Sequence, residues 1–171
     1  RVRTPSQWGS KILEALGATP VSMPMSDVYE SLERGVIDAA MVPLETLHNW
    51  SFHEIAKYVT VGNFSPTPFF VVMNTDTYNS LSDAEKEVLN QMGGMVAAEK
   101  AGRVFDVDGQ QGRQKSEENG AEIIELTGDK LKPWQEALAP VAQEWMKEME
   151  AQGYPAQKLY ERALELKEEL R

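Results

Sequence analysis

The sequence predicts an α/β fold in which parallel strands are joined by crossover helices. Along residues 1–42, short apolar segments alternate with segments whose apolar residues recur every three or four positions. Parallel strands need a crossover between them, so this β-α-β-α-β alternation favours a parallel sheet. A long helical segment and a helical C-terminal region follow, which adds further helices to the sheet.

The first strand and helix are predicted from residues 1–17. Residues 1–4 form a strand that Pro5 ends, because proline donates no hydrogen bond to a sheet. Residues 6–16 form a helix, followed by Gly17, which suits the left-handed position after a helix. The predicted buried face of this helix consists of Trp8, Ile12, Leu13 and Leu16.

The alternation continues from residue 18 to residue 42. Residues 18–22 predict the second strand, and residues 36–42 predict the third. Between them, Ser26 is the expected N-cap of a helix that Gly35 ends. The expected buried face of that helix consists of Val28, Tyr29 and Leu32.

Residues 43–58 are predicted to be mostly helical. Ser51, followed three residues later by Glu54, has the form of a capping box, which begins a helix. We therefore expect a break in the helix near residue 50. The apolar run 69–73 is predicted to be a fully buried strand, since turn-forming residues bound it. Those bounding residues are Pro66, Pro68 and Asn74-Thr75-Asp76.

A long helix is predicted after this strand. Ser82 and Glu85 again have the capping-box form, and helical spacing continues from residue 83 to about residue 118. That length exceeds the mean helix of about 11 to 12 residues, so we expect the helix to span more than one lobe. A bend is expected near Gly93 and Gly94.

The C-terminal region is predicted to contain one strand followed by helices. Residues 121–126 predict the strand. After Pro133, apolar residues at spacings of three and four predict a helix, and residues 155–171 predict a last amphipathic helix.

Composition narrows the classes of function. The chain has 171 residues, 42% of them hydrophobic, enough for one domain or for two lobes that share segments. Its 27 acidic and 17 basic residues give a net charge of −10, which opposes binding to nucleic acid or anionic lipid. No stretch approaches the roughly 20 apolar residues that span a bilayer, so we expect no direct membrane insertion.

Two further features concern the cellular compartment. The chain has no cysteine, which excludes a disulfide framework, a thiolate metal site and a cysteine nucleophile. This absence fits the cytosol and a bacterial periplasm equally well. The chain begins at Arg1 without an initiator methionine, a charged leader or an apolar signal region. We therefore expect a fragment whose targeting signal lies upstream or has been removed.

A ligand site is predicted at the carboxyl ends of the parallel strands, where helix N-termini present unpaired N–H groups. Residues 3–7, 23–26 and 41–44 lie at these ends and are expected to converge on one cleft. Arg3 carries the only formal charge among them, and a guanidinium binds a carboxylate through two parallel hydrogen bonds. The site therefore suits an organic anion. From position alone, a surface arginine is an equally good interpretation of Arg3.

Four apolar side chains near these strand ends are further candidates for ligand contact. Met25 precedes the expected N-cap, and the position where a hydrophobic staple partner would lie is the charged Glu30. Met25 therefore cannot form a hydrophobic staple, which leaves ligand contact as one interpretation. A position in the core is the alternative. Met41 and Val42 also suit the end of an apolar strand, and Trp8 also suits a core.

No cofactor or metal site is predicted. His48 and His53 are five residues apart, which does not place two ligands on one helix face, and no cysteine completes a zinc set. The sequence lacks a G-x-S-x-G elbow, a P-loop and a G-x-G-x-x-G turn, and its acidic residues are scattered. These absences give no support to an enzyme.

The same residues resemble the DctP-type solute-binding proteins of TRAP transporters, which deliver carboxylates to a sodium-driven membrane permease. The matching stretches are Val2-Arg3-Thr4-Pro5, Leu16-Gly17-Ala18-Thr19-Pro20-Val21, Met23-Pro24-Met25-Ser26-Asp27-Val28-Tyr29, Leu32 and Gly35-Val36-Ile37-Asp38-Ala39-Ala40. A looser likeness continues through Lys57-Tyr58, residues 69–74 and Leu81-Ser82, so it covers nearly the whole chain.

The resemblance implies a periplasmic-binding-protein-like lobe, plus a long helix and C-terminal helices shared with a missing N-terminal lobe. Residues 1–68 would form the ligand-binding α/β lobe. The crossing strand would run over residues 67–70, from the end of that lobe, and residues 69–120 would contain the rest of this strand and the long helix. Residues 121–171 would form a strand and C-terminal helices packed on the lobes.

The resemblance also implies roles for site residues. In that family the arginine matched by Arg3 makes the main salt bridge to the ligand carboxylate. The position of Met25 carries a ligand-contacting side chain, and that of Ser6 a polar contact. Many members place a polar residue after an Asp-Gly pair, whereas here Asp38-Ala39 leads to Met41 and Val42. The implied ligand is a monocarboxylate with a hydrophobic or aromatic body.

The chain is therefore predicted to be the periplasmic solute-binding component of a TRAP-type transporter, with its signal peptide removed. It would capture a small organic acid and deliver it to the membrane permease subunits. The implied ligand-binding residues are Arg3, Ser6, Trp8, Met25, Met41 and Val42. Two other interpretations stay open: a small α/β enzyme acting on an anionic substrate, and a structural or partner-binding domain.

Overall fold

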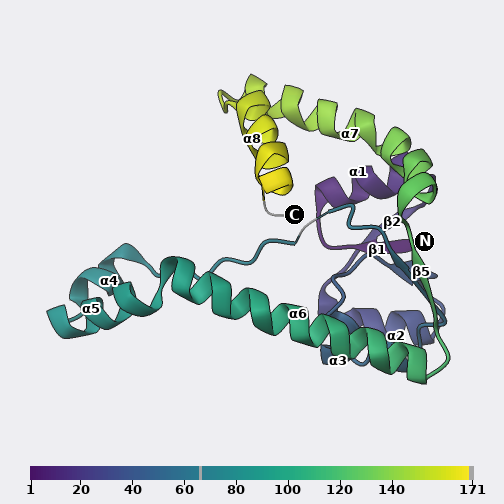
Figure 1. Ribbon diagram of the computed structural model, residues 1–171, viewed down its shortest axis with the longest axis horizontal. Helices are drawn as coiled ribbons and strands as arrows, with labels where there is room; N and C mark the ends of the chain where they lie inside the picture. Colours follow the sequence, from purple (N-terminus) through teal and green to yellow (C-terminus); the bar gives the residue numbers. More distant parts are fainter. Residues whose placement is uncertain (66, 170–171) are drawn as a thin grey trace. The chain divides into compact units, whose positions relative to one another are not determined.

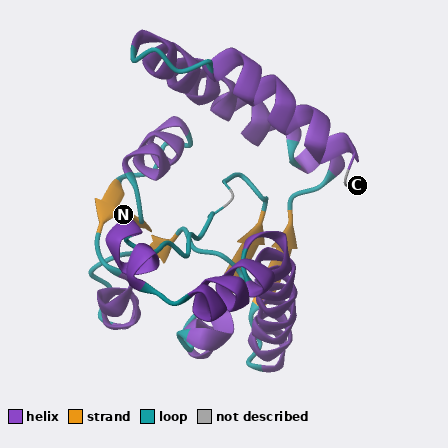
Figure 2. Cartoon of the chain, turned by 90° about the vertical axis from the view of Figure 1, so that its left-hand side faces the viewer, coloured by secondary structure: helices purple, strands orange, loops and turns teal. Residues whose placement is uncertain are grey.

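The computed structural model describes residues 1–65 and 67–169. The chain forms two compact units, each built from separate stretches of the sequence. The first unit contains residues 1–28, 34–41 and 126–171, and the second contains residues 29–33 and 42–125. Both units combine short strands with helices (Figures 1 and 2).

The first unit is built on a parallel sheet with β1 (Val2–Thr4) in the middle. Strands β2 (Pro20–Ser22) and β3 (Ala39–Ala40) pair with opposite edges of β1. Arg3 of β1 is in register with Val21 and with Ala40. The predicted parallel sheet is thus confirmed.

Helix α1 (Gln7–Ala15) connects β1 to β2 and packs on both strands. The Ser6 hydroxyl oxygen caps the helix by accepting a hydrogen bond from the Gly9 N–H. Gly9 is buried, and a Cβ there would collide with Thr4 Oγ1 and lie 2.8 Å from Met41 Cε. The absence of a side chain at Gly9 therefore allows the close approach of helix and sheet.

The crossover from β2 to β3 differs from the prediction at its start. A 3₁₀ turn (Met25–Asp27) leads directly into α2 (Val28–Glu33). Ser26 was expected as the N-cap, and that prediction is wrong, because Ser26 lies inside the turn and its hydroxyl donates to the Asp27 carboxylate. The turn begins right after Pro24, whose fixed φ favours a turn one residue earlier.

The two crossover helices end where the sequence predicts, whereas the third strand is shorter than predicted. Gly17 and Gly35 follow α1 and α2 with φ of +79° and +68°, as predicted. The strand predicted over residues 36–42 is reduced to the two residues of β3. Its only partner among the described strands is β1, which is itself three residues long, and the pairing involves only Val2 and Arg3 of that strand.

The first unit is completed by C-terminal helices that follow a 3₁₀ turn (Gly128–Lys130): α7 (Lys132–Ala151) and α8 (Ala156–Glu169). Pro133 lies in the first turn of α7, where its missing N–H leaves no helical bond unmade. Helix α7 contacts both α1 and α8 (Figure 1). Both predicted helices are confirmed. Residues 170 and 171, the end of the predicted last stretch, lie outside the described residues.

The second unit contains a two-stranded parallel sheet of β4 (Tyr58–Val61) and β5 (Glu122–Glu125). Strand β5 confirms the strand predicted over residues 121–126. Tyr58 was expected at the end of a helix, but it begins β4 instead. Its partner strand lies more than 60 residues away in sequence, and local spacing does not reveal such a pairing.

The helical segment before β4 is shorter than predicted. It contains α3 (Thr46–Asn49) and a 3₁₀ turn (Phe52–Glu54), with the expected break at Trp50 between them. Ser51 adopts a left-handed conformation with φ of +53°, and its side chain makes no capping bond. The capping box predicted at Ser51 is therefore wrong, because an N-cap needs an extended backbone.

Three helices follow in the second unit: α4 (Thr75–Ser80), α5 (Asp83–Met92) and α6 (Gly94–Glu118). The capping box predicted at Ser82 is confirmed, since Ser82 and Glu85 each accept a bond from the other's N–H. The bend predicted near Gly93 is a complete break, with Gly94 at φ of +56°.

Within the described residues, no helix is both long and apolar enough to cross a bilayer.

Residues 69–73 do not form the predicted buried strand. No described strand pairs with them, and their side chains are exposed, from 48% at Met73 to 103% at Val71. The crossing strand implied at residues 67–70 is likewise absent from the described strands. Pro66, one of the residues used to bound the run, lies outside the described residues. An apolar run forms a strand only where its backbone groups find partners.

Helix α3 packs against α6 through small residues of α6 that are buried: Gly109, Gly112 and Ser116. A Cβ at Gly112 would lie 2.8 Å from the carbonyl oxygen of Leu44 and 2.9 Å from Leu47 Cβ. A glycine inside a helix costs roughly 1 kcal/mol relative to alanine. At Gly112 this cost is offset by the close approach of the two helices.

We expect Gly112→Ala to lower the free energy of unfolding by about 1 to 3 kcal/mol, because backbone atoms of Leu44 and His48 must move to make room for the added methyl group. The measurement is chemical unfolding followed by circular dichroism. The matched control is Gly102→Ala in the same helix, where an added Cβ meets nothing within 4 Å and alanine is expected to stabilise. Equal effects of the two substitutions would contradict the packing described.

Candidate functional site

Arg3 lies in the central strand β1 and is buried, with 4% of its surface exposed. Its Nε donates a hydrogen bond to the carbonyl oxygen of Met23, just after β2, at 3.2 Å. That bond is its only polar side-chain contact to the described residues. Burial lowers the pKa of Arg3, because a cation removed from water is disfavoured.

The terminal nitrogens of the Arg3 guanidinium, Nη1 and Nη2, have no hydrogen-bond partner among the described residues. The bond to Met23 uses Nε alone. In the described part of the chain, no side-chain nitrogen or oxygen is both fully buried and unpaired, so Nη1 and Nη2 still reach water. A buried cation without a counter-ion among the described residues favours an incoming anion, and the fork of a guanidinium matches a carboxylate. This arrangement can bind an organic acid.

The carboxyl ends of the strands of the first unit meet at one edge of the sheet. The Met41 N–H donates to the Arg3 carbonyl oxygen at 2.9 Å, and Arg3 in turn bonds to Met23. Met25 is half-buried and begins the 3₁₀ turn two residues after Met23. Val42 belongs to the second unit, and its part in the site stays a prediction.

The other candidate residues of the first unit make contacts of their own. The Ser6 oxygen caps α1, and Ser6 is exposed. Trp8 is half-buried, with Lys11 Nζ 4.6 Å from the centroid of its ring. Met41 Cε lies beside Gly9 of α1. The ligand-binding roles of Ser6, Trp8, Met25 and Met41 stay predictions.

A charge cluster joins α1 to α7, and sequence reasoning missed it. Lys11 Nζ donates to Glu144 Oε1 at 2.5 Å and to Glu148 Oε1 at 2.7 Å. The hydrogen bonds to Glu144 and then Glu148 raise the pKa of Lys11. The spacing of the two glutamates places them on one helix face, but nothing in the sequence pairs them with a lysine more than 130 residues away.

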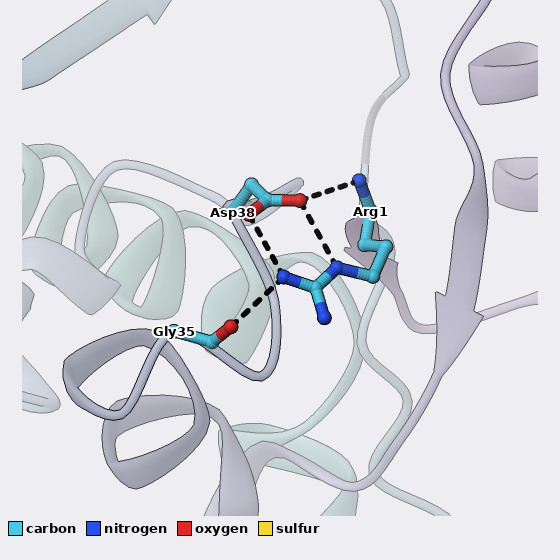
Figure 3. A network of polar contacts seen from close by, with 3 residues as sticks. All are labelled: Arg1, Gly35 and Asp38. Atoms are coloured by element: carbon cyan, nitrogen blue, oxygen red, sulfur yellow. Dashed lines mark hydrogen bonds and ion pairs between the residues drawn. The ribbon is translucent and has the colours of Figure 1, made fainter.

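A second missed cluster ties the start of β1 to the loop before β3 (Figure 3). Arg1 Nε and Nη2 donate to the two carboxylate oxygens of Asp38 at 3.2 Å and 3.0 Å. Nη2 also donates to the Gly35 carbonyl oxygen at 2.8 Å. The bonds from Arg1 hold the pKa of Asp38 well below its usual range. The cluster thus holds the strand that carries Arg3.

The two histidines contact other groups. His53 Nδ1 lies 2.6 Å from the Leu47 carbonyl oxygen, and His48 Nδ1 lies 2.9 Å from Lys115 Nζ. Over residues 1–65 and 67–169, no group of three or more histidine, aspartate or glutamate side chains is placed to hold a metal ion.

Comparison with known proteins identifies the family. Residues 1–149 match DctP, described as bacterial extracellular solute-binding protein, family 7. The chain belongs to this family. One DctP-family relative is the C4-dicarboxylate-binding periplasmic protein DctP of Rhodobacter capsulatus, which is 28% identical over 155 residues. That similarity covers 87% of this chain and 46% of the relative.

Two solved structures of TRAP solute-binding proteins are similar to this DctP-family chain. One, from an unidentified microbe of a marine metagenome, is specific for aromatic acid ligands; it is 33% identical, with a TM-score of 0.88, over 96% of this chain and 53% of that protein. The other, from Desulfovibrio salexigens, is 34% identical, with a TM-score of 0.78, over 96% of this chain and 51% of that protein. The chain therefore spans about half the length of these relatives.

The comparisons confirm three predictions. The α/β fold matches that of TRAP solute-binding proteins. The matched relatives are solute-binding proteins rather than enzymes, so the enzyme interpretation is set aside. The DctP family is extracytoplasmic, and its relatives are periplasmic, which agrees with the predicted localisation.

Glu45 is a buried carboxylate of the second unit that lies just before α3, with 7% of its surface exposed. Burial, followed by the negative charge of Asp108, raises the pKa of Glu45, while its own backbone N–H lowers it. The folded state therefore holds the proton more tightly than the unfolded state, where a glutamate has a pKa of about 4.3. The protonated Glu45 therefore stabilises the fold at pH values below the unfolded-state pKa. This contribution is lost as the pH rises through the higher pKa that Glu45 has in the folded state.

We expect Glu45→Gln to unfold at a higher temperature than the unmodified protein at pH 7, and at a similar temperature near pH 4. The amide carries no charge to bury, so the difference grows with pH. Thermal unfolding between pH 4 and pH 7 measures it. Glu136→Gln, at an exposed position, is the control and is expected to show no such trend. A Glu45→Gln variant that is less stable at pH 7 would show that the carboxylate is stabilising.

Proposed function

We propose that this chain is part of the solute-binding component of a TRAP-type transporter, which captures an organic carboxylate through Arg3 and delivers it to the membrane permease subunits. The observation that carries the proposal is the buried Arg3, whose Nη1 and Nη2 have no partner among the described residues. A protein gains little from burying such a charge unless an anion binds it. Membership of the DctP family agrees with this role.

The proposed ligand is a monocarboxylate with an apolar or aromatic body. Met25 lies two residues after Met23, whose carbonyl oxygen bonds Arg3, and Met41 donates its own N–H to Arg3. Neither methionine offers a second charge to a ligand. Trp8 and Val42 are proposed to add apolar surface. The marine metagenome relative, 33% identical, binds 3-hydroxybenzoate, which has this chemistry. A C4-dicarboxylate is the second candidate, because the Rhodobacter capsulatus relative is named for it.

We further propose the division of the chain that the resemblance implies. Residues 1–68 would supply the ligand-binding lobe, residues 69–120 the crossing segment and long helix, and residues 121–171 the C-terminal helices. The exposed apolar run 69–73 supports a contact with the rest of a longer protein, since contiguous apolar surface is usually covered. The ligand would then bind in a cleft between two lobes of the full-length protein.

The first test is ligand screening of the full-length protein by thermal shift, followed by calorimetry. Aromatic monocarboxylates such as 3-hydroxybenzoate are expected to stabilise it more than C4-dicarboxylates or sugar acids. Arg3→Met is expected to lose about 2 to 5 kcal/mol of binding free energy, which is typical of removing one partner of a buried charge pair. Arg3→Lys is expected to restore part of it, since lysine keeps the charge and loses the fork.

The thermal stability of the ligand-free protein provides the control for folding. Arg3→Met is expected to melt at or above the temperature of the unmodified protein, because it removes a buried cation that no described acid neutralises. Arg103→Met, at an exposed position of α6, is the matched control and should leave binding unchanged. Unchanged binding in Arg3→Met would exclude Arg3 as the anchor. Preference for a dicarboxylate would favour the second candidate.

A second test concerns residues 69–73. We expect their amides to exchange hydrogen slowly in the full-length protein and quickly in the 171-residue chain, because in the shorter chain no described strand pairs with them. Hydrogen exchange with mass spectrometry measures both rates. Peptides from β1, whose partner strands lie within the chain, serve as the reference. Equal rates at residues 69–73 in both proteins would contradict the proposed contact.

A further inference from the structure

The Lys11 cluster is unusual for a surface ion pair. Lys11 Nζ bonds to two carboxylates of α7, and its side chain is 20% exposed. Glu144 and Glu148 are four residues apart, so both extend from one face of α7 toward the same nitrogen. The Trp8 ring lies 4.6 Å from that nitrogen and gives the cation a third partner. A half-buried lysine with three partners is more strongly held than an exposed pair.

Helix α7 lies at the surface of the first unit. None of its residues is buried, although the helix is 20 residues long. Its main contacts in that unit are with α1, α8 and the turn that precedes it. Because α8 follows α7 and contacts it, the contact between α7 and α1 holds both helices. The Lys11 cluster adds two ion pairs to that contact.

Helix α1 begins at the edge of the sheet where the ligand site is proposed. Its N-cap Ser6 lies three residues after Arg3, and its Gly9 fits closely against Thr4 of β1. The same helix carries Lys11 one to two turns later. A ligand bound at Arg3 would therefore lie near one end of α1, and α7 is bound to the same helix through Lys11.

We propose that Lys11, Glu144, Glu148 and Trp8 form a clasp that holds α7 and α8 on α1, and that this clasp transmits ligand binding at Arg3 to the C-terminal helices. The coupling rests on the proposed function, whereas the clasp itself does not. Ligand binding restricts the motion of α1, and the clasp passes this restriction to α7 and α8. Because coupling is reciprocal, opening the clasp weakens ligand binding.

Hydrogen exchange of the ligand-free full-length protein tests the clasp. Lys11→Met is expected to speed exchange in peptides of α7 and α8 by about fivefold, while peptides of β4 and β5 stay unchanged. The matched control is Lys147→Met, an exposed lysine on α7 that makes no ion pair to the described residues. The charge swap Lys11→Glu with Glu144→Lys and Glu148→Lys is expected to restore slow exchange. Equal exchange in Lys11→Met and the unmodified protein overturns the clasp.

Addition of 3-hydroxybenzoate, or of the best ligand from the thermal-shift screen, tests the coupling. The ligand is expected to slow exchange of α7 and α8 in the unmodified protein and to leave these peptides unchanged in Lys11→Met. If the ligand binds and slows exchange near Arg3 but not in α7 and α8, the coupling is wrong and the proposed function stands. If no organic acid binds, the proposed function and the coupling are both wrong. The ligand-free experiment still tests whether the clasp holds α7 and α8 on α1.

Discussion

The structure of the first unit depends on strand β1, which pairs with β2 and β3 at once and carries a buried arginine. Its backbone holds the sheet together, and its register aligns the ends of the neighbouring strands. Arg3 links these ends, because its side-chain Nε donates to the Met23 carbonyl oxygen and its own backbone carbonyl oxygen accepts a bond from the Met41 N–H. A single residue thus contributes to the sheet and to the proposed anion site.

Close helix packing supports both units, and glycine makes it possible in each. Gly9 lets α1 approach β1 in the first unit, and Gly112 lets α3 approach α6 in the second. From sequence alone, a glycine inside a helix is predicted only to lower the stability of that helix relative to alanine. The structure shows that Gly102 has open space around it while Gly112 does not, so residues of one type in one helix have different roles.

Local signals predicted elements well where the elements depend on neighbours in sequence. The capping box at Ser82 forms because its partner Glu85 lies on the next turn and the backbone of Ser82 is extended. The same pattern at Ser51 fails, since Ser51 takes up a left-handed conformation between α3 and a 3₁₀ turn. Residues 69–73 have the composition of a buried strand, yet the described residues offer them no partner. A strand forms only when its backbone groups pair with a second segment, so the composition of one segment alone cannot predict it.

The sequence by itself determined the parallel α/β class, the helix ends at Gly17 and Gly35, and Arg3 as the charge at the strand ends. These follow from spacing, backbone preference and the connection rules for parallel strands, which act over a few residues. Only the tertiary structure decided that Arg3 is buried with Nη1 and Nη2 unpaired within the described residues, and that Lys11 contacts Glu144 and Glu148. Burial and long-range ion pairs depend on segments far apart in the chain, and their positions follow from how the helices pack.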